Sequence, residues 1–73
     1  MPDTKVEELT PKETEILKLI GRGHTSKEIA GKLHLSADTV ANHRKHLCAK
    51  LKLHSTAALV AFAARYVHKN RGQ

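Results

Sequence analysis

Four helix-start signals divide this chain of 73 residues into short segments that suit a small helical domain. Thr10 and Thr25 each precede a glutamate by three residues, which is the spacing of a capping box at the start of a helix. Ser36 and Ser55 are also residue types that favour the N-cap position. No alternation of polar and apolar residues is long enough for a strand. We therefore predict an all-α fold of four helices.

The ends of these helices follow from stop signals and apolar periodicity. The first helix is stopped by Gly21 and Gly23, and the second follows Thr25 for about two turns. The third is expected over residues 37–52, and the fourth runs from its cap to residue 67 or 68. His34 stands in the turn between the second and third helices, where the chain needs a residue that tolerates positive φ.

A chain of this length holds one small core and therefore one domain. We expect that domain over residues 9–68, between a linker or disordered N-terminus at residues 1–8 and a polar tail at residues 69–73. The apolar residues at helical spacing form the predicted core: Leu9, Ile16, Leu17, Ile20, Ile29, Ala30, Leu33, Val40, Leu47, Leu51, Leu59, Phe62, Ala63 and Tyr66.

Charge is divided unevenly along the chain. Residues 1–38 carry six basic and seven acidic residues, whereas residues 39–73 carry seven basic and no acidic residues. This basic half predicts a surface that binds a polyanion. Because Phe62 is the only phenylalanine and Tyr66 the only tyrosine, stacking on single-stranded nucleic acid is a poor fit, and duplex DNA is favoured.

Several classes of protein do not fit the composition. No apolar run approaches the ~20 residues of a membrane span, and the N-terminus lacks the apolar segment of a secretory signal. The lone Cys48 cannot form an internal disulfide, which suits the cytoplasm. Neither paired carboxylates nor a glycine-rich phosphate loop is present, so we expect no enzyme activity and no cofactor. We also expect no metal site, because Cys48 projects away from His43 and His46 on the third helix.

The third helix is predicted to have a buried and an exposed side. At about 100° per residue, three apolar residues share one stripe: Val40, Leu47 and Leu51. Asn42 and Lys45 project to the opposite side, and Ala41 lies on a flank. In a major groove, asparagine pairs with adenine, lysine donates to guanine, and alanine meets the thymine methyl group. These three residues are the predicted base contacts.

Donors and cations border this exposed side. The other flank of the third helix carries polar side chains, and the free N–H groups at the start of the second helix form a site for a phosphate. The predicted contacts to the DNA backbone are Thr25, Ser26, Lys27, Thr39, His43, His46 and Lys50. Arg44 falls near the buried stripe and is expected to pair with Glu13 or Glu28.

The fourth helix is apolar on all sides from Ala57 to Ala64, so both of its faces require burial. One face closes the core. The other face predicts a homodimer contact formed by Ala57, Val60, Ala61 and Ala64. One short helix pair buries little area, so self-association of the isolated domain should be weak. Alanines are also tolerated on a helix surface, which leaves a monomer open.

The second and third helices, joined by His34-Leu35-Ser36, form a helix-turn-helix pattern. The segments with the most specific spacing are L-T-P-K-E (Leu9–Glu13), E-I-L-K-L-I-G-R-G (Glu15–Gly23), T-S-K-E-I-A (Thr25–Ala30), L-H-L-S-A-D-T-V (Leu33–Val40), His43 and Lys50-Leu51. Over about residues 8–66 the chain resembles the LuxR/NarL/FixJ-type helix-turn-helix domain.

This resemblance implies a four-helix DNA-binding domain, a bundle that is winged-helix-like but has no wing. It implies that the third helix enters the major groove and that the fourth forms a homodimer. It places Ala41, Asn42 and Lys45 at base-facing positions, and it implies backbone contacts from Thr25, Lys27, Thr39, His43 and Lys50. It also implies an upstream receiver or ligand-sensing domain, as in two-component response regulators, with RNA polymerase as a candidate partner.

Four residues depart from the pattern. Ser26 stands where the family often has asparagine, Ala41 where it often has lysine, and Thr56 and Ala58 where arginine and glutamate are common. The sequence thus predicts an effector domain of a transcription regulator that binds double-stranded DNA. Two alternatives remain open: a basic helical module that dimerises and docks an acidic protein partner, and an RNA-binding protein.

Overall fold

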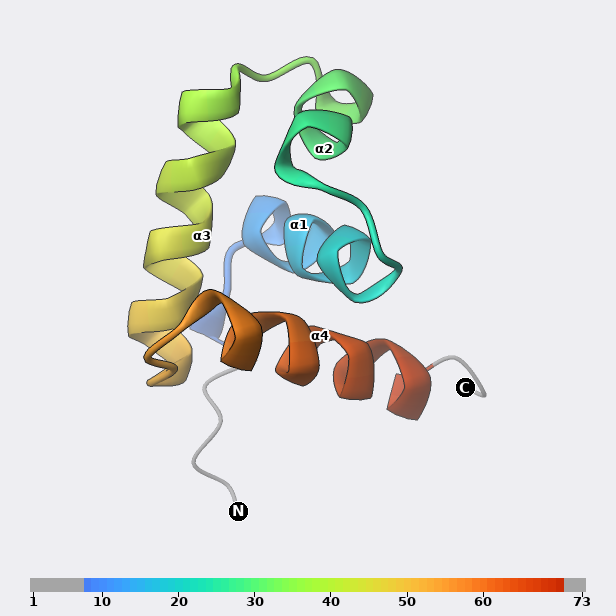
Figure 1. The fold of residues 1–73 in the computed structure, drawn as a ribbon, viewed down its shortest axis with the longest axis vertical. Coiled ribbons are helices and arrows are strands. Elements are labelled where there is room, and N and C mark those ends of the chain that lie inside the picture. Colours follow the sequence, from blue (N-terminus) through green and yellow to red (C-terminus); the bar gives the residue numbers. More distant parts are fainter. Residues whose placement is uncertain (1–7, 71–73) are drawn as a thin grey trace.

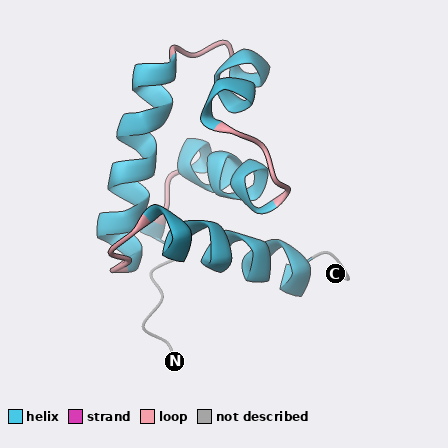
Figure 2. Cartoon of the chain, in the orientation of Figure 1, coloured by secondary structure: helices cyan, strands magenta, loops and turns pink. Residues whose placement is uncertain are grey.

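The computed structural model describes residues 8–70, with side chains to residue 69, and every regular element in this range is a helix (Figures 1 and 2). The four helices are α1 (Pro11–Gly21), α2 (Ser26–Leu33), α3 (Ala37–Leu51) and α4 (Thr56–Asn70). The predicted all-helical class is confirmed for the described residues. Most of the predicted linker (residues 1–8) and of the predicted tail (residues 69–73) lies outside the described range, at residues 1–7 and 71–73.

All four expected caps form at helix N-termini. Thr10 accepts a hydrogen bond from the N–H of Glu13 at 3.1 Å, and the Glu13 carboxylate accepts one from the N–H of Thr10 at 3.0 Å. Thr25 and Glu28 make the same reciprocal pair at the start of α2. The Ser36 hydroxyl accepts from Thr39 at 3.0 Å, and the Ser55 hydroxyl accepts from Ala58 at 3.0 Å. These bonds satisfy N–H groups that a helix leaves unpaired in its first turn.

Two helix ends differ from the sequence-based boundaries. Lys52 was expected inside α3, but it adopts a left-handed conformation with φ of 58° and ends the helix at Leu51. Its N–H donates to carbonyls of the last turn, as in a glycine-terminated helix. His34 also has φ of 58°, as predicted. α4 extends to Asn70 instead of ending at residue 67 or 68, so Lys69 and Asn70, which were expected in the polar tail, belong to the helix.

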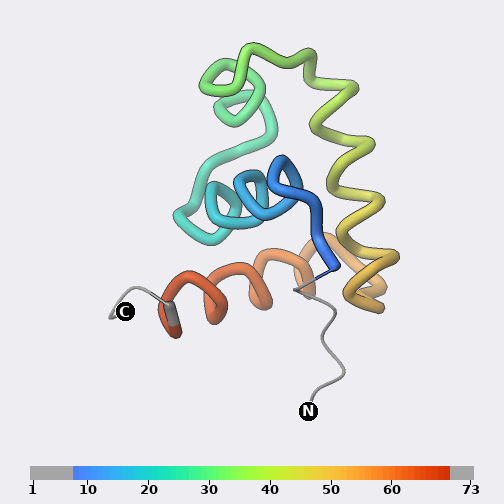
Figure 3. Tube along the Cα trace, turned by 180° about the vertical axis from the view of Figure 1, so that it is seen from behind, coloured from blue at the N-terminus to red at the C-terminus, as the bar shows by residue number. Residues whose placement is uncertain are grey.

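α1 lies at the centre of the molecule, with α2 above it, α3 along one side and α4 crossing beneath it (Figures 1 and 3). The core contains Ile16, Leu17, Ile20, Ile29, Ala30, Val40, Leu47, Leu51, Leu59 and Ala63, all of which were predicted. Leu9, Leu33, Phe62 and Tyr66 pack against it while remaining partly exposed. α1 and α4 approach closely at Gly21, where a Cβ atom would lie 2.8 Å from the carbonyl carbon of Ala63.

Among the described residues, no single helix is long and apolar enough to cross a membrane. Taken together, α3 and α4 reach that length and composition, but they are bent by 77° where they meet.

Candidate nucleic-acid interface

α3 packs through one side and leaves the other side open. Val40 and Leu47 are fully buried and Leu51 is 5% exposed, as the helical projection predicted. Ser36 holds the first turn in place through bonds to Thr39, both to its N–H and to its hydroxyl at 2.9 Å. The helix therefore has a fixed orientation, which determines which side chains can meet a partner.

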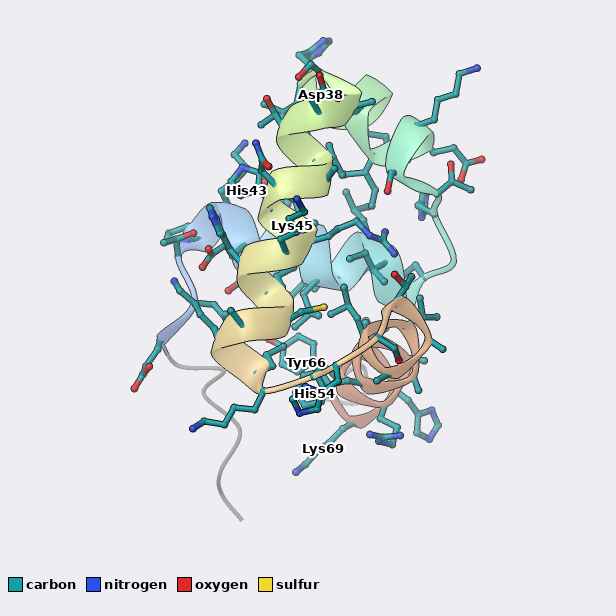
Figure 4. All side chains as sticks on the ribbon, turned by 60° about the vertical axis from the view of Figure 1, so that its left-hand side comes forward. Asp38, His43, Lys45, His54, Tyr66 and Lys69 are labelled. Carbon is teal, nitrogen blue, oxygen red and sulfur yellow. The ribbon has the colours of Figure 1, made fainter. Side chains whose placement is uncertain are left out.

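All three predicted base contacts are exposed to solvent: Ala41, Asn42 and Lys45. Lys45 extends outward from the face of α3 that is turned to the viewer in Figure 4. None of the three is packed in the core, so all three side chains are accessible to a partner.

The predicted phosphate contacts form two groups. One group lies at the start of α2, where Thr25 and Lys27 are exposed and Ser26 is half-buried. The N–H of Thr25, which was expected to be free for a phosphate, donates instead to the Glu28 carboxylate at 2.8 Å. The described hydrogen bonds leave the N–H groups of Ser26 and Lys27 for an anion.

The second group lies along α3. Its exposed member is His46, and its half-buried members are Thr39, His43 and Lys50. His43 projects from α3 on the side where α1 begins (Figure 4). Its Nδ1 is buried and has no hydrogen-bond partner among the described residues. A buried ring nitrogen without a partner is uncommon and carries a free-energy cost.

Lys50 has a partner that the sequence did not predict. Its Nζ lies 2.8 Å from Oε1 of Glu13, whose side chain is only 7% exposed, and 3.4 Å from the backbone oxygen of Glu8. Burial raises the pKa of the Glu13 carboxyl. The hydrogen bond from Lys50, the N–H of Thr10 and the charge of Lys50 outweigh this effect and lower the pKa below its usual 4.5. Lys50 thus joins α3 to the start of α1.

The expected pairing of Arg44 with Glu13 or Glu28 is wrong. Glu13 is occupied by Lys50, and the Glu28 carboxylate caps α2. Arg44 is instead half-buried and lines an open groove of about 450 Å³ between α3 and the start of α4. Ala41 and Lys45 line the same groove. No acidic side chain lines it among the described residues, so the groove is electropositive.

The predicted dimer residues Ala57, Val60, Ala61 and Ala64 are all exposed on α4. Among the described residues, Val60 is the most exposed large apolar residue, and 41% of it is accessible to solvent. Leu59, next to it in the sequence, is fully buried. α4 thus has one buried face and one exposed apolar face, and the exposed face is not covered by the residues that the structure describes.

Comparison with known proteins supplies a family for this arrangement. The profile described as "Bacterial regulatory proteins, luxR family" (GerE) matches residues 7–63. The chain is 48% identical over 58 residues to the uncharacterized response regulatory protein YgeK of Escherichia coli K12, covering 80% of this chain and 40% of YgeK. It is 44% identical over 66 residues to the nitrate/nitrite response regulator protein NarL of the same strain, covering 90% of this chain and 29% of NarL.

A third relative is the oxygen regulatory protein NreC of Staphylococcus carnosus, which is 46% identical over 57 residues. That match covers 78% of this chain and 26% of NreC. The chain thus spans well under half the length of the relatives it matches.

Proposed function

Because the chain belongs to the luxR family of bacterial regulatory proteins, we propose that α3 is the recognition helix of a DNA-binding transcription regulator. DNA-binding regulation is the shared role of these helix-turn-helix domains, and no enzyme activity is expected of them. The assignment of α3, of its base-reading residues and of the dimer is our proposal.

The observation that carries the proposal is the pairing of a buried stripe with an exposed polar side on one helix. Val40 and Leu47 hold α3 to the core, while Asn42 and Lys45 face solvent. Asn42 can form two hydrogen bonds with adenine, and Lys45 can donate to O6 and N7 of guanine. Ala41 is small enough to let the helix approach the bases closely.

Phosphate contacts would then come from both sides of the groove-bound helix. Ser26 and Lys27 at the start of α2, with Thr25 beside them, hold one strand, and Thr39, His43, His46 and Lys50 hold the other. We add Arg44 to this set, because it lines the electropositive groove beside Lys45 and has no carboxylate partner there. Contacts of this kind provide most of the affinity and make it depend on salt.

Substituting Lys45 by alanine should weaken binding to the selected duplex by about 1–3 kcal/mol and relax the preference at one base pair. The cognate site is first selected from a random duplex library, and both affinities are measured at about 50 mM salt by fluorescence anisotropy. Lys69→Ala is the matched control, because Lys69 is exposed but lies at the end of α4 (Figure 4). An equal loss on cognate and random duplexes would contradict the base-reading role of Lys45.

The outer face of α4 is proposed to join two copies, so that two α3 helices lie in successive major grooves about one helical turn apart. Val60→Glu should abolish the extra affinity for a duplex with two half-sites and leave the affinity for one half-site unchanged. Val60→Lys should also abolish the extra affinity, although the positive charge of lysine attracts DNA. Loss in both variants would show that the apolar side chain, and not the charge at this position, joins the two copies. Retained cooperativity in both variants would exclude this face as the dimer contact.

The regulatory setting follows from the relatives. YgeK, NarL and NreC are response or oxygen regulators, and this chain matches only 26–40% of their lengths. We propose that a receiver or ligand-sensing domain controls this domain in a longer protein, and that the bound regulator contacts RNA polymerase.

One rival role is a module that dimerises and docks an acidic protein, and another is RNA binding. Titration with random duplex DNA at low salt distinguishes the protein-docking role from the proposed function, because a protein-docking module need not bind DNA. Competition with duplex RNA tests the second.

A further inference from the structure

A cluster of three metal-binding side chains lies where α3 crosses the start of α1. Glu13 of α1 and His43 and His46 of α3 each offer a ligand atom, and these atoms all lie within 4.8 Å of one another. Cys48, which was expected to project away from the two histidines, does not belong to this cluster. The third ligand instead comes from a residue that is 30 positions away from His43.

Fixed backbone geometry brings the three side chains together. His43 and His46 are three residues apart on α3, so they project from the same side of the helix. Glu13 is held by the capping box of α1, in which its carboxylate accepts from the N–H of Thr10. In a metal site the ligand atoms would lie about 3.4 Å apart, given metal–ligand bonds of about 2.1 Å. Small side-chain rotations can shorten the distances between the ligand atoms, which are now up to 4.8 Å, to this value.

The state of each side chain also favours a cation. Nδ1 of His43 is buried and has no hydrogen-bond partner among the described residues, so no described protein group competes for it. His46 is exposed, which gives a cation a path from solvent. Glu13 is a buried carboxylate, only 7% exposed, that already pairs with the cation Lys50. Two imidazoles and one carboxylate are a ligand set that Zn²⁺ and related transition metals accept.

Lys50 is the resident cation of this site. Its Nζ bonds to Oε1 of Glu13, the same oxygen that accepts from Thr10. The Lys50 side chain is 35% exposed, so it can turn into solvent when another cation neutralises Glu13. The buried carboxylate of Glu13 can therefore be neutralised either by Lys50 or by a bound metal ion.

We propose that Glu13, His43 and His46 form a binding site for one divalent transition-metal ion, Zn²⁺ or a similar ion, that joins α1 to α3. Water completes the coordination. Because His43 and His46 are also proposed phosphate contacts, a bound metal would withdraw them from DNA. Metal binding itself needs no DNA, so it is tested separately from the proposed function.

The test is a titration of the untagged chain with Co²⁺, a coloured substitute for Zn²⁺, followed by Zn²⁺ competition. We expect one Co²⁺ per chain, visible absorption that Zn²⁺ removes, and paramagnetic broadening of amide signals around Glu13, His43 and His46. Zn²⁺ should also raise the melting temperature, because it binds the folded state. Absence of saturable binding at millimolar metal, or broadening centred elsewhere, would overturn the proposal.

Variants locate the site. His46→Gln should weaken Co²⁺ binding at least tenfold, and it should keep the fold, because His46 is exposed. Glu13→Gln should also weaken binding, and circular dichroism checks that this variant remains folded. His54→Gln and Cys48→Ser are matched controls, since they remove another exposed histidine and the nearby thiol. A loss in either control as large as that in His46→Gln would refute this ligand set.

Discussion

Leu59→Ala should lower the free energy of unfolding by about 3–4 kcal/mol, because truncating a fully buried leucine in a packed core costs about 2–5 kcal/mol. Leu59 closes the core from α4, where no other large apolar side chain is fully buried among the described residues. A domain of this size has a total stability of only about 4–11 kcal/mol, so the variant should lose a large part of it. Urea unfolding followed by circular dichroism measures the change.

Val60→Ala is the matched control, because it truncates the next residue of the same helix, whose side chain is exposed. Val60 is 41% exposed, so the change should stay within about 0.5 kcal/mol in the monomer. Equal losses in the two variants would mean that α4 presents a different face to α1. The pair thereby also tests the premise of the dimer proposal, which requires Val60 to face outward.

Local signals were sufficient to predict the helices and the core. Capping boxes involve residues three apart, and the apolar stripe of α3 follows from helical period, so a single sequence carries both. The positive φ of His34 was predicted for the same reason. The similar conformation of Lys52 was missed, since lysine gives no local signal for a left-handed helix end.

Long-range pairing was harder to predict. The helical projection placed Arg44 near the buried stripe of α3 and Lys50 on a flank, so it favoured Arg44 as the partner of Glu13. The pairing depends on where α1 crosses α3, which brings Lys50 rather than Arg44 to the capping box. The same crossing assembles Glu13 with the two histidines, and no spacing rule within one helix could have predicted that.

Substituting Lys50 by methionine should lower the free energy of unfolding at pH 7 by about 2–3 kcal/mol. Methionine keeps the apolar stem but leaves the Glu13 carboxylate buried without its countercharge. Loss of one partner from a fully buried pair costs about 3–5 kcal/mol, and the partial exposure of Lys50 reduces that figure. Lys12→Met is the control, because the Lys12–Glu15 pair is exposed and its loss should cost no more than about 0.5 kcal/mol.

The pH dependence identifies the cause of the loss. In the native protein the pKa of Glu13 is lowered below 4.5, so its ionised form stabilises the fold fully above pH 4.5. That contribution disappears as the pH falls through the lowered value. In Lys50→Met, burial is no longer opposed by Lys50, so the pKa should rise and the buried carboxylate should destabilise the fold at neutral pH. The stability difference between the two proteins should therefore shrink as the pH falls through the raised pKa of Glu13 in the variant and then through its lowered pKa in the native protein. A difference that stays constant with pH would assign the loss to packing of the Lys50 stem instead of to charge.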